Sequence, residues 1–133
     1  MTRCRPVLVL IALLLLARLA AAQSPGESRH VEIDGHAMHL SIAGAGPITV
    51  VLEAGGGFSL SQWDKVQPAL AQFARVVSYD RPGLGKSVKC EKPETAQRVA
   101  TELHAALQLA GVLPPYLLVA HSMGGPFARV FTR

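Results

Sequence analysis

The chain has 133 residues, half of them apolar, and its 13 Lys and Arg against 9 Asp and Glu give a formal net charge of +4. Three of the basic residues, Arg3, Arg5 and Arg18, lie within the first 22 positions, which contain no acidic residue. The other 10 basic and 9 acidic residues leave a charge of +1. The basic balance therefore gives no support for a nucleic-acid partner.

The N-terminus has the layout of a secretory signal peptide. Arg3 and Arg5 precede an apolar run from Val7 to Ala17, and the small residues Ala20 to Ala22 offer a cleavage site. This run is much shorter than the roughly 20 apolar residues of a membrane-spanning helix, so no stable membrane anchor is expected. We predict that residues 1–22 are a signal peptide cleaved near Ala22, and that the mature protein is secreted or periplasmic.

The mature chain is predicted to hold one domain after a short linker. Residues 23–30 are polar and include Pro25 and Gly26, as a linker does, and residues 31–133 would form the domain. Cys90 is the only cysteine left once the leader and Cys4 are removed, so no disulfide can form within this chain.

Alternating and continuous apolar runs predict the first elements. Val31–Asp34 and Met38–Ile42 alternate around Asp34-Gly35, which indicates a β-hairpin. Ile48–Leu52 is a continuous β-branched run, typical of a strand buried on both faces. The stretch Leu60–Phe73 has apolar residues three and four apart, which predicts one helix carrying Trp63, Val66, Leu70 and Phe73.

The second half continues as alternating strands and helices. Val76–Tyr79 and Tyr116–Ala120 are two more short apolar runs that predict buried strands, and the periodicity of residues 94–110 predicts a helix ended by Gly111. The last residues, PFARVFTR, predict a helix with no stop signal after it, which we interpret as a chain that breaks off inside an element. Strands joined by helices run parallel, so we expect an α/β protein: an open, mostly parallel sheet with helices on both faces.

The segment Ser78–Ser87, SYDRPGLGKS, ends in Gly-Lys-Ser as a phosphate-binding P-loop does. The P-loop motif G-x-x-x-x-G-K-[ST] needs a glycine where this chain has Asp80. A carboxylate at that position would repel a phosphate in the very turn that should bind it. Nucleotide binding is therefore disfavoured, and the segment needs another role.

Ser122 stands at the junction of a predicted strand and a predicted helix, in the sequence Ala120-His121-Ser122-Met123-Gly124. The frame resembles the nucleophile elbow G-x-S-x-G, a sharp strand-to-helix turn that exposes a serine hydroxyl, with Ala120 in place of the first glycine. Small residues are needed on both sides because so sharp a turn brings its neighbours into contact. Alanine is the least costly substitute for glycine there.

Three stretches, VVLEAGGG, YDRPGLGKS and LVAHSMGGP, together resemble the N-terminal half of an α/β-hydrolase fold serine hydrolase and occur in that family's order. The resemblance covers the chain after the polar linker. In this family the second stretch supports the active site from below and binds no phosphate. It implies that Gly83 and Gly85 are turn glycines and that Asp80 and Ser87 make structural hydrogen bonds.

The resemblance also implies a mechanism, the cleavage of a small-molecule ester or amide through an acyl-enzyme on Ser122, without cofactor or metal. In the family, the loop after the first of these strands reads His-Gly and then a residue whose backbone N–H forms half of the oxyanion hole. Here Ala54-Gly55 takes that place, so Gly56 is the expected donor and Gly57 the next best. The N–H of Met123 is the expected second donor. Serine at the elbow argues against the family's epoxide hydrolases and dehalogenases, which use aspartate there.

The acid and the histidine of a catalytic triad are missing from this chain. In this fold they follow the serine, but residues 123–133 contain no Asp, Glu or His. We interpret His36, His39 and His104 as solvent-exposed, and His121 as turned away from the nucleophile. Among the acidic side chains we expect Asp64 to be a surface residue, and Asp80 and Glu53 to be loop anchors.

Three interpretations of the missing residues remain open. The chain is either the first half of a serine hydrolase about twice as long, or an inactive truncated product, or part of a non-catalytic member that binds a small hydrophobic ligand in the same pocket. The residues that would bind substrate are not identifiable. In the first two cases the parallel strands would have an open edge, which favours aggregation.

Overall fold

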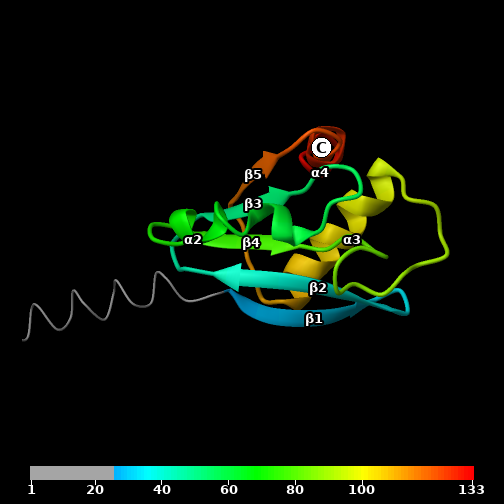
Figure 1. The fold of residues 1–133 in the computed structure, drawn as a ribbon, viewed down its shortest axis with the longest axis horizontal. Coiled ribbons are helices and arrows are strands. Elements are labelled where there is room, and N and C mark those ends of the chain that lie inside the picture. The colour runs from blue at the N-terminus through cyan, green and yellow to red at the C-terminus, as the bar shows by residue number, and fades with distance from the viewer. Residues whose placement is uncertain (1–25) are drawn as a thin grey trace, which may run out of the picture.

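The computed structural model describes residues 26–133. The predicted signal peptide and the start of the predicted linker lie outside these residues. The described chain forms a five-stranded sheet with the strand order β1-β2-β4-β3-β5 and helices packed against it (Figure 1). The elements are β1 (Glu27–Ile33), β2 (His36–Ala43), β3 (Thr49–Glu53), η1 (Leu60–Trp63), α2 (Gln67–Leu70), β4 (Arg75–Tyr79), α3 (Ala96–Leu109), β5 (Tyr116–Ala120) and α4 (Gly124–Phe131).

The predicted hairpin is confirmed. Strands β1 and β2 pair antiparallel, with Ile33 opposite His36, and the two-residue turn between them has φ of 49° at Asp34 and 83° at Gly35. Positive φ at both turn residues matches the right-handed twist of the flanking strands, which is why Asp-Gly is favoured there. Strand β1 begins at Glu27 rather than near Val31, so residues 27–30 of the predicted linker belong to the sheet.

The sheet is mixed, which corrects the expectation of a mostly parallel one. Strand β3 pairs in parallel with both β4 and β5, as the strand-helix-strand order predicts. Strand β2 pairs antiparallel with β4 as well as with β1. The hairpin therefore extends the sheet as an antiparallel edge beside the parallel strands.

Helices cover both faces of the sheet, as predicted. In β3, Val51 is buried in the core on the face of α3, whereas Val50 and Leu52 are buried on the opposite face with Trp63 of η1. Successive side chains of a strand point to opposite faces, so a strand that is apolar throughout must be covered on both. Helix α3 begins at the N-cap Thr95, whose hydroxyl accepts a hydrogen bond from Arg98 N, and Gly111 follows its end. No helix within residues 26–133 is long and apolar enough to cross a membrane.

The single helix predicted over residues 60–73 is wrong, because two short helical turns, η1 and α2, replace it. Pro68 lies in the first turn of α2, and a proline there lacks the N–H that a continuous helix would need and collides with the preceding turn. As a result Phe73 is 73% exposed, and the buried residue of α2 is Gln67. The Gln67 side chain accepts a hydrogen bond from Ser78 Oγ at 2.7 Å and donates one to Ser41 O at 3.0 Å.

Strand β5 forms where it was predicted, but it is not buried. Leu117 is 56% exposed and Val119 36% exposed. Within the described part of the chain, β5 pairs only with β3 and forms one edge of the sheet, opposite β1 (Figure 1). The apolar run of this strand therefore lacks the cover on its second side that its sequence predicts.

Candidate active site

Ser122 lies on a tight turn between β5 and α4. Its φ is 52°, in the left-handed region that non-glycine residues seldom adopt, and its side chain is exposed. Two backbone hydrogen bonds of 2.9 Å close the turn, from Gly124 N to His121 O and from Gly125 N to Ser122 O. A residue held in this region carries strain on the order of 1–3 kcal/mol, and such strain is characteristic of a nucleophile elbow.

Gly124 is the point where the turn touches the sheet. A Cβ at this position would lie 2.7 Å from Glu53 Cγ and 2.8 Å from the carbonyl oxygen of Ala54. The end of β3 thus approaches the start of α4 so closely that only glycine fits without displacement. His121 N also donates a hydrogen bond of 3.1 Å to Glu53 O, which holds the two strand ends together.

The glycine loop, residues 54–57, lies against this turn. A Cβ on Gly56 would stand 3.2 Å from Met123 Cγ, so the two residues expected to supply oxyanion donors are neighbours. The N–H of Gly55 is engaged, since it donates to Gln62 Oε1 at 3.0 Å. By contrast, within residues 26–133 the N–H groups of Gly56 and Met123 donate to no protein oxygen and stay available to a ligand.

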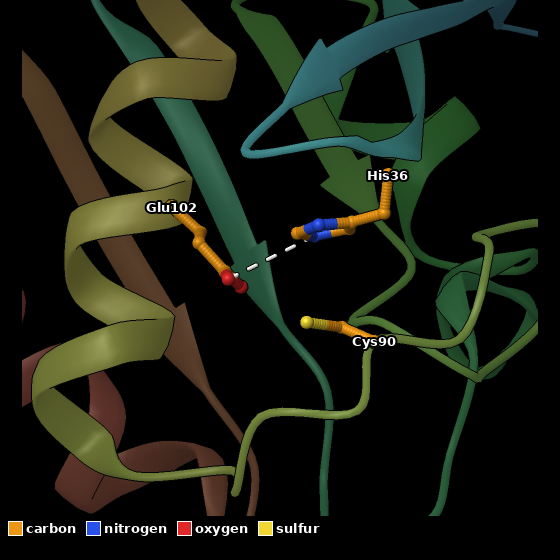
Figure 2. A group of neighbouring side chains, drawn as sticks. All are labelled: His36, Cys90 and Glu102. Carbon is orange, nitrogen blue, oxygen red and sulfur yellow. Dashed lines mark ion pairs between the residues drawn. The ribbon is translucent and has the colours of Figure 1, made fainter.

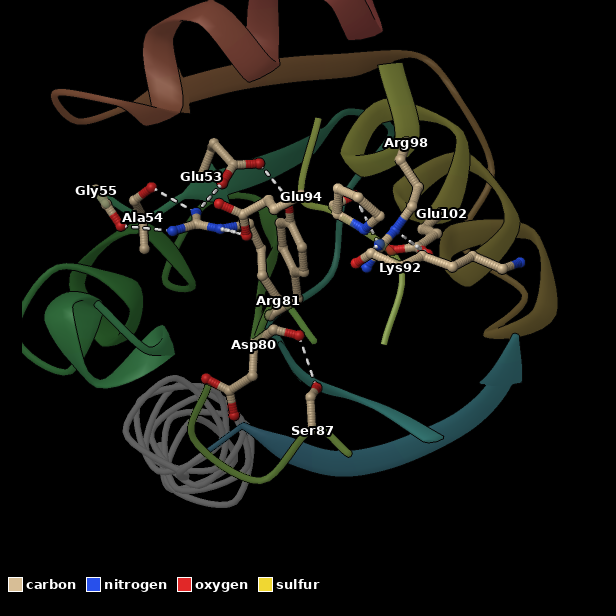
Figure 3. A network of polar contacts seen from close by, with 12 residues as sticks. Glu53, Ala54, Gly55, Asp80, Arg81, Ser87, Lys92, Glu94, Arg98 and Glu102 are labelled. Carbon is tan, nitrogen blue, oxygen red and sulfur yellow. Dashed lines mark hydrogen bonds and ion pairs between the residues drawn. The ribbon is translucent and has the colours of Figure 1, made fainter. Parts of the chain in front are cut away.

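A buried arginine fixes the glycine loop. Arg81 is 2% exposed; its Nη1 donates to Glu53 Oε1 at 2.6 Å and to Ala54 O at 2.8 Å, and its Nη2 donates to Gly55 O at 2.6 Å (Figure 3). Its Nε donates to Glu94 Oε2 at 3.2 Å. The guanidinium thus binds the last residue of β3 and the first two residues of the loop. No role was predicted for Arg81 from the sequence; its signal was a second charged residue, after Asp80, at the end of the apolar strand Val76–Tyr79.

Glu53 is the anchor that was expected. It is 1% exposed and accepts hydrogen bonds from the Tyr79 hydroxyl and from Arg81. Burial raises the pKa of the Glu53 carboxyl above its ordinary value of 4.5, because desolvation disfavours the charge, and the Tyr79 hydrogen bond and the Arg81 charge offset this only in part. Tyr79 is buried as well, and desolvation of its hydroxyl, together with the negative charge of Glu53 beside it, raises the pKa of Tyr79 well above its usual 10.0.

The loop that resembled a P-loop is held together by Asp80. Its Oδ1 accepts a hydrogen bond from Leu60 N at 2.7 Å, and its Oδ2 accepts one from Lys86 N at 2.9 Å. Ser87 Oγ donates to Asp80 O at 2.7 Å. Gly83 and Gly85 have φ of 80° and 52°, as turn glycines do. The structural roles expected for these residues are confirmed, and the loop encloses a carboxylate where a P-loop would hold phosphate.

Two of the histidines expected at the surface are buried. His36 is 4% exposed and His39 is 3% exposed, whereas His104 is exposed as predicted. His39 Nδ1 lies 2.8 Å from Asp80 Oδ2, and its Nε2 lies 2.8 Å from Ser28 Oγ. The prediction failed because distant segments cover this part of β2: α3 and the loop after β4 pack over it, and the local sequence of a hairpin does not reveal such contacts.

The described residues bring no histidine–carboxylate pair to Ser122. The pairs that they do form are His39 with Asp80 and, at 3.8 Å, His36 with Glu102. Both histidines belong to β2, and β4 and β3 separate this strand from β5 in the sheet. A cavity of about 300 Å³ lies beside β2 and α2. Its lining includes Ser41 and Gln67 but not Ser122.

Comparisons of sequence place these features in a family. A model described as the alpha/beta hydrolase family matches residues 50–130. The chain is 39% identical over 93 residues to the uncharacterized protein YqjL of Bacillus subtilis, an alignment that covers 69% of this chain and 37% of that protein. It is 37% identical over 82 residues to an AB hydrolase superfamily protein of Gibberella zeae, covering 61% of this chain and 26% of that protein.

Solved structures give the same result. Cfl2 from Burkholderia cenocepacia superimposes with a TM-score of 0.75 at 31% identity, over 83% of this chain and 37% of that one. The epoxide hydrolase VrEH1 from Vigna radiata superimposes with a TM-score of 0.71 at 27% identity, over 80% of this chain and 35% of that one. The chain therefore spans little more than a third of these proteins, and in fold and in sequence it belongs to the alpha/beta hydrolase family.

Proposed function

We propose that this chain is the N-terminal half of a serine hydrolase that cleaves a small-molecule ester or amide through an acyl-enzyme. The observation that carries the proposal is the position of Ser122: exposed, at a φ of 52°, on the turn between β5 and α4. Membership of the hydrolase family supplies the reaction class. The serine supplies the nucleophile, since a strained turn presents its hydroxyl to solvent rather than to a backbone partner.

The proposed reaction begins when Ser122 Oγ attacks the substrate carbonyl carbon and its proton passes to a histidine base. The carbonyl π electrons move to the oxygen, and the N–H groups of Gly56 and Met123 would stabilise that oxyanion; each donor contributes about 3–4 kcal/mol to such a transition state. Collapse of the tetrahedral intermediate expels the alcohol or amine, which takes the proton from the histidine. Water then attacks the acyl-enzyme by the same route and releases the acid.

The histidine and its carboxylate partner are proposed to follow Arg133 in the complete protein. This agrees with the family order of serine, acid and histidine, and with the lack of Asp, Glu and His in residues 123–133. Secretion through a signal peptide at residues 1–22 is part of the same proposal.

Several structurally similar proteins are epoxide hydrolases, among them VrEH1 of Vigna radiata and the Cif enzyme of Acinetobacter nosocomialis. The resemblance described above implies an aspartate at the elbow of such enzymes, whose carboxylate opens the epoxide. This chain has a serine there. A serine hydroxyl supports acyl transfer instead, and the proposal is therefore an esterase or amidase.

Turnover of a p-nitrophenyl ester by the full-length protein tests the proposal. We expect Ser122→Ala to lower kcat by at least about a thousandfold, because the nucleophile is lost. Ser61→Ala, which alters an exposed serine of η1, should leave turnover unchanged. Equal turnover by the wild type and Ser122→Ala would exclude Ser122 as the nucleophile. Tight binding of the ester without turnover by the wild type would favour the non-catalytic, ligand-binding alternative.

A further inference from the structure

Three side chains from separate segments converge beside helix α3. His36 comes from the start of β2, Cys90 from the loop after β4, and Glu102 from α3 (Figure 2). One ligand atom of each lies within 4.8 Å of the other two. Figure 2 shows the imidazole, the thiol and the carboxylate pointing toward a common centre. We propose that His36, Cys90 and Glu102 bind a zinc ion.

Three buried polar atoms at this centre, both ring nitrogens of His36 and Glu102 Oε2, have no hydrogen-bond partner among the described residues. His36 is 4% exposed, and within the described part of the chain neither of its ring nitrogens makes a hydrogen bond. Glu102 is 3% exposed, and its Oε2 is unpartnered in the same sense. The nearest approach, 3.8 Å between His36 Nε2 and Glu102 Oε1, is too long for a hydrogen bond. Buried polar groups are nearly always paired, and a metal ion would satisfy a nitrogen of the first and an oxygen of the second.

Arg98 orients the Glu102 carboxylate and fixes the segment that follows Cys90. Its Nε donates to Glu102 Oε1 at 2.8 Å, which leaves Oε2 for the ion. Its Nη1 donates to Lys92 O and, at 2.8 Å, to Pro93 O, so it ties the segment after Cys90 to the helix (Figure 3). A ligating carboxylate is commonly hydrogen-bonded from outside in this way, which fixes its orientation. Arg98 is therefore a positioning residue.

The ligand types select the metal. A thiolate is a poor ligand for magnesium or calcium, whereas zinc accepts imidazole nitrogen, thiolate sulfur and carboxylate oxygen together. Zinc–ligand bonds are about 2.0–2.3 Å long, so tetrahedral ligand atoms stand roughly 3.5 Å apart. The three ligand atoms now lie up to 4.8 Å apart. They reach the tetrahedral spacing if each of them moves by less than about 1 Å. The half-buried Cys90 would lose its thiol proton to solvent on binding, and solvent would supply the fourth ligand.

The proposed site is separate from the chemistry proposed at Ser122, because β4 and β3 lie between β2 and β5 in the sheet. The ion would join three segments, the hairpin, the loop after β4 and α3, and so stabilise this edge of the sheet. The proposal does not depend on the hydrolase activity.

Cobalt substitution tests the site in the full-length, tag-free protein after chelator treatment. We expect one Co²⁺ per chain with a thiolate-to-cobalt absorption band, which zinc then displaces. Zinc should also raise the melting temperature by about 5 °C or more, since a ligand that binds only the folded state stabilises it. Cys90→Ser should abolish the band, and His36→Gln and Glu102→Gln should weaken binding more than about 100-fold.

Matched controls alter the same residue types at the surface. His30→Gln on β1 and Glu91→Gln beside Cys90 should bind cobalt like the wild type, because both side chains are exposed. The proposal is wrong if the wild type shows no thiolate band at one equivalent of Co²⁺, or if the band persists in Cys90→Ser. It is equally wrong if His36→Gln binds as tightly as the wild type. The wild-type titration decides the question even if a variant fails to fold.

Discussion

At the scale of single residues, the buried pair of Glu53 and Arg81 is the feature that connects the sheet to the site. Arg81 satisfies both the Glu53 carboxylate and two loop carbonyls, those of Ala54 and Gly55. Burying two charges is expensive, and removing one partner of such a pair costs about 3–5 kcal/mol because the other charge is left unpaired. The pair therefore specifies where the glycine loop lies more than it adds to stability.

The raised pKa of Glu53 predicts how stability depends on pH. A carboxyl whose pKa is higher in the folded state than its unfolded value of 4.5 binds its proton more tightly when folded. The resulting stabilisation is fully present below pH 4.5 and is lost as pH rises through the folded pKa. The unfolding free energy of the wild type minus that of Glu53→Gln should therefore fall across this window, by about 1.4 kcal/mol for each pH unit that separates the two pKa values. Urea unfolding from pH 4 to 8 measures it, and a difference that grows with pH would contradict the prediction.

Several residues could be placed from the sequence because their roles are local. The turn that exposes Ser122 follows from its place between a strand and a helix, and the bonds of Asp80 to Lys86 and Ser87 follow from its place in a glycine turn. Arg81 and the buried histidines His36 and His39 could not be placed. Their partners are separated from them by tens of positions. Arg81 meets them where the loop after β4 packs on the end of β3, and the two histidines meet theirs where that loop and α3 pack on the hairpin.

At the scale of elements, the contact between β3 and α4 sets the position of the turn that carries Ser122. Gly124→Ala would place a Cβ within 2.8 Å of atoms of Glu53 and Ala54, and overpacking of this kind costs about 1–3 kcal/mol. Gly125→Ala is a matched control in the same helical turn, where a Cβ would meet nothing within 4 Å. It should be neutral or stabilising by up to about 1 kcal/mol, because alanine is the better helix former.

Urea unfolding midpoints at unchanged m-value measure both glycine variants. Gly124→Ala should also slow the labelling of Ser122 by a fluorophosphonate, whereas Gly125→Ala should not. Equal midpoints for the two variants would contradict the close contact between β3 and α4.

A proline explains why residues 60–73 form two short helical turns and not the one predicted helix. The periodicity of Trp63, Val66, Leu70 and Phe73 was real, but Pro68 stands in the middle of it and ends any continuous helix. The constraint that Pro68 places on the backbone outweighs the apolar spacing of these side chains.

At the scale of the whole molecule, β5 is an edge strand that exposes apolar side chains to solvent. Leu117 and Val119 are 56% and 36% exposed, and within residues 26–133 the outer edge of β5 has no neighbouring strand. An apolar edge with unpaired N–H and C=O groups promotes association. The isolated chain should therefore self-associate.

Leu117→Lys should reduce this association by placing a charge on the strand. Phe73→Lys is the matched control, since Phe73 is 73% exposed but follows α2 and belongs to no strand of the sheet. Light scattering of the isolated chains measures the difference. If Phe73→Lys reduces scattering as much as Leu117→Lys does, general hydrophobicity rather than the β5 edge is responsible.

Most of the architecture was predictable because it follows from local pattern. The hairpin, the parallel β3, β4 and β5, the helix α3 and helices on both faces all follow from apolar periodicity and turn residues. Two features did not. The antiparallel pairing of β2 with β4 and the exposure of β5 depend on which strands become neighbours, and no local pattern encodes that.

The central claim is that Ser122 is the nucleophile of a hydrolase of which this chain is the first half. The most direct test is the intact mass of the secreted full-length protein before and after treatment with a fluorophosphonate. We predict a mature species that begins at Gln23, extends past Arg133 and gains one probe per molecule, while Ser122→Ala gains none. A wild-type protein that gains no probe, or a Ser122→Ala protein labelled equally, would contradict the claim.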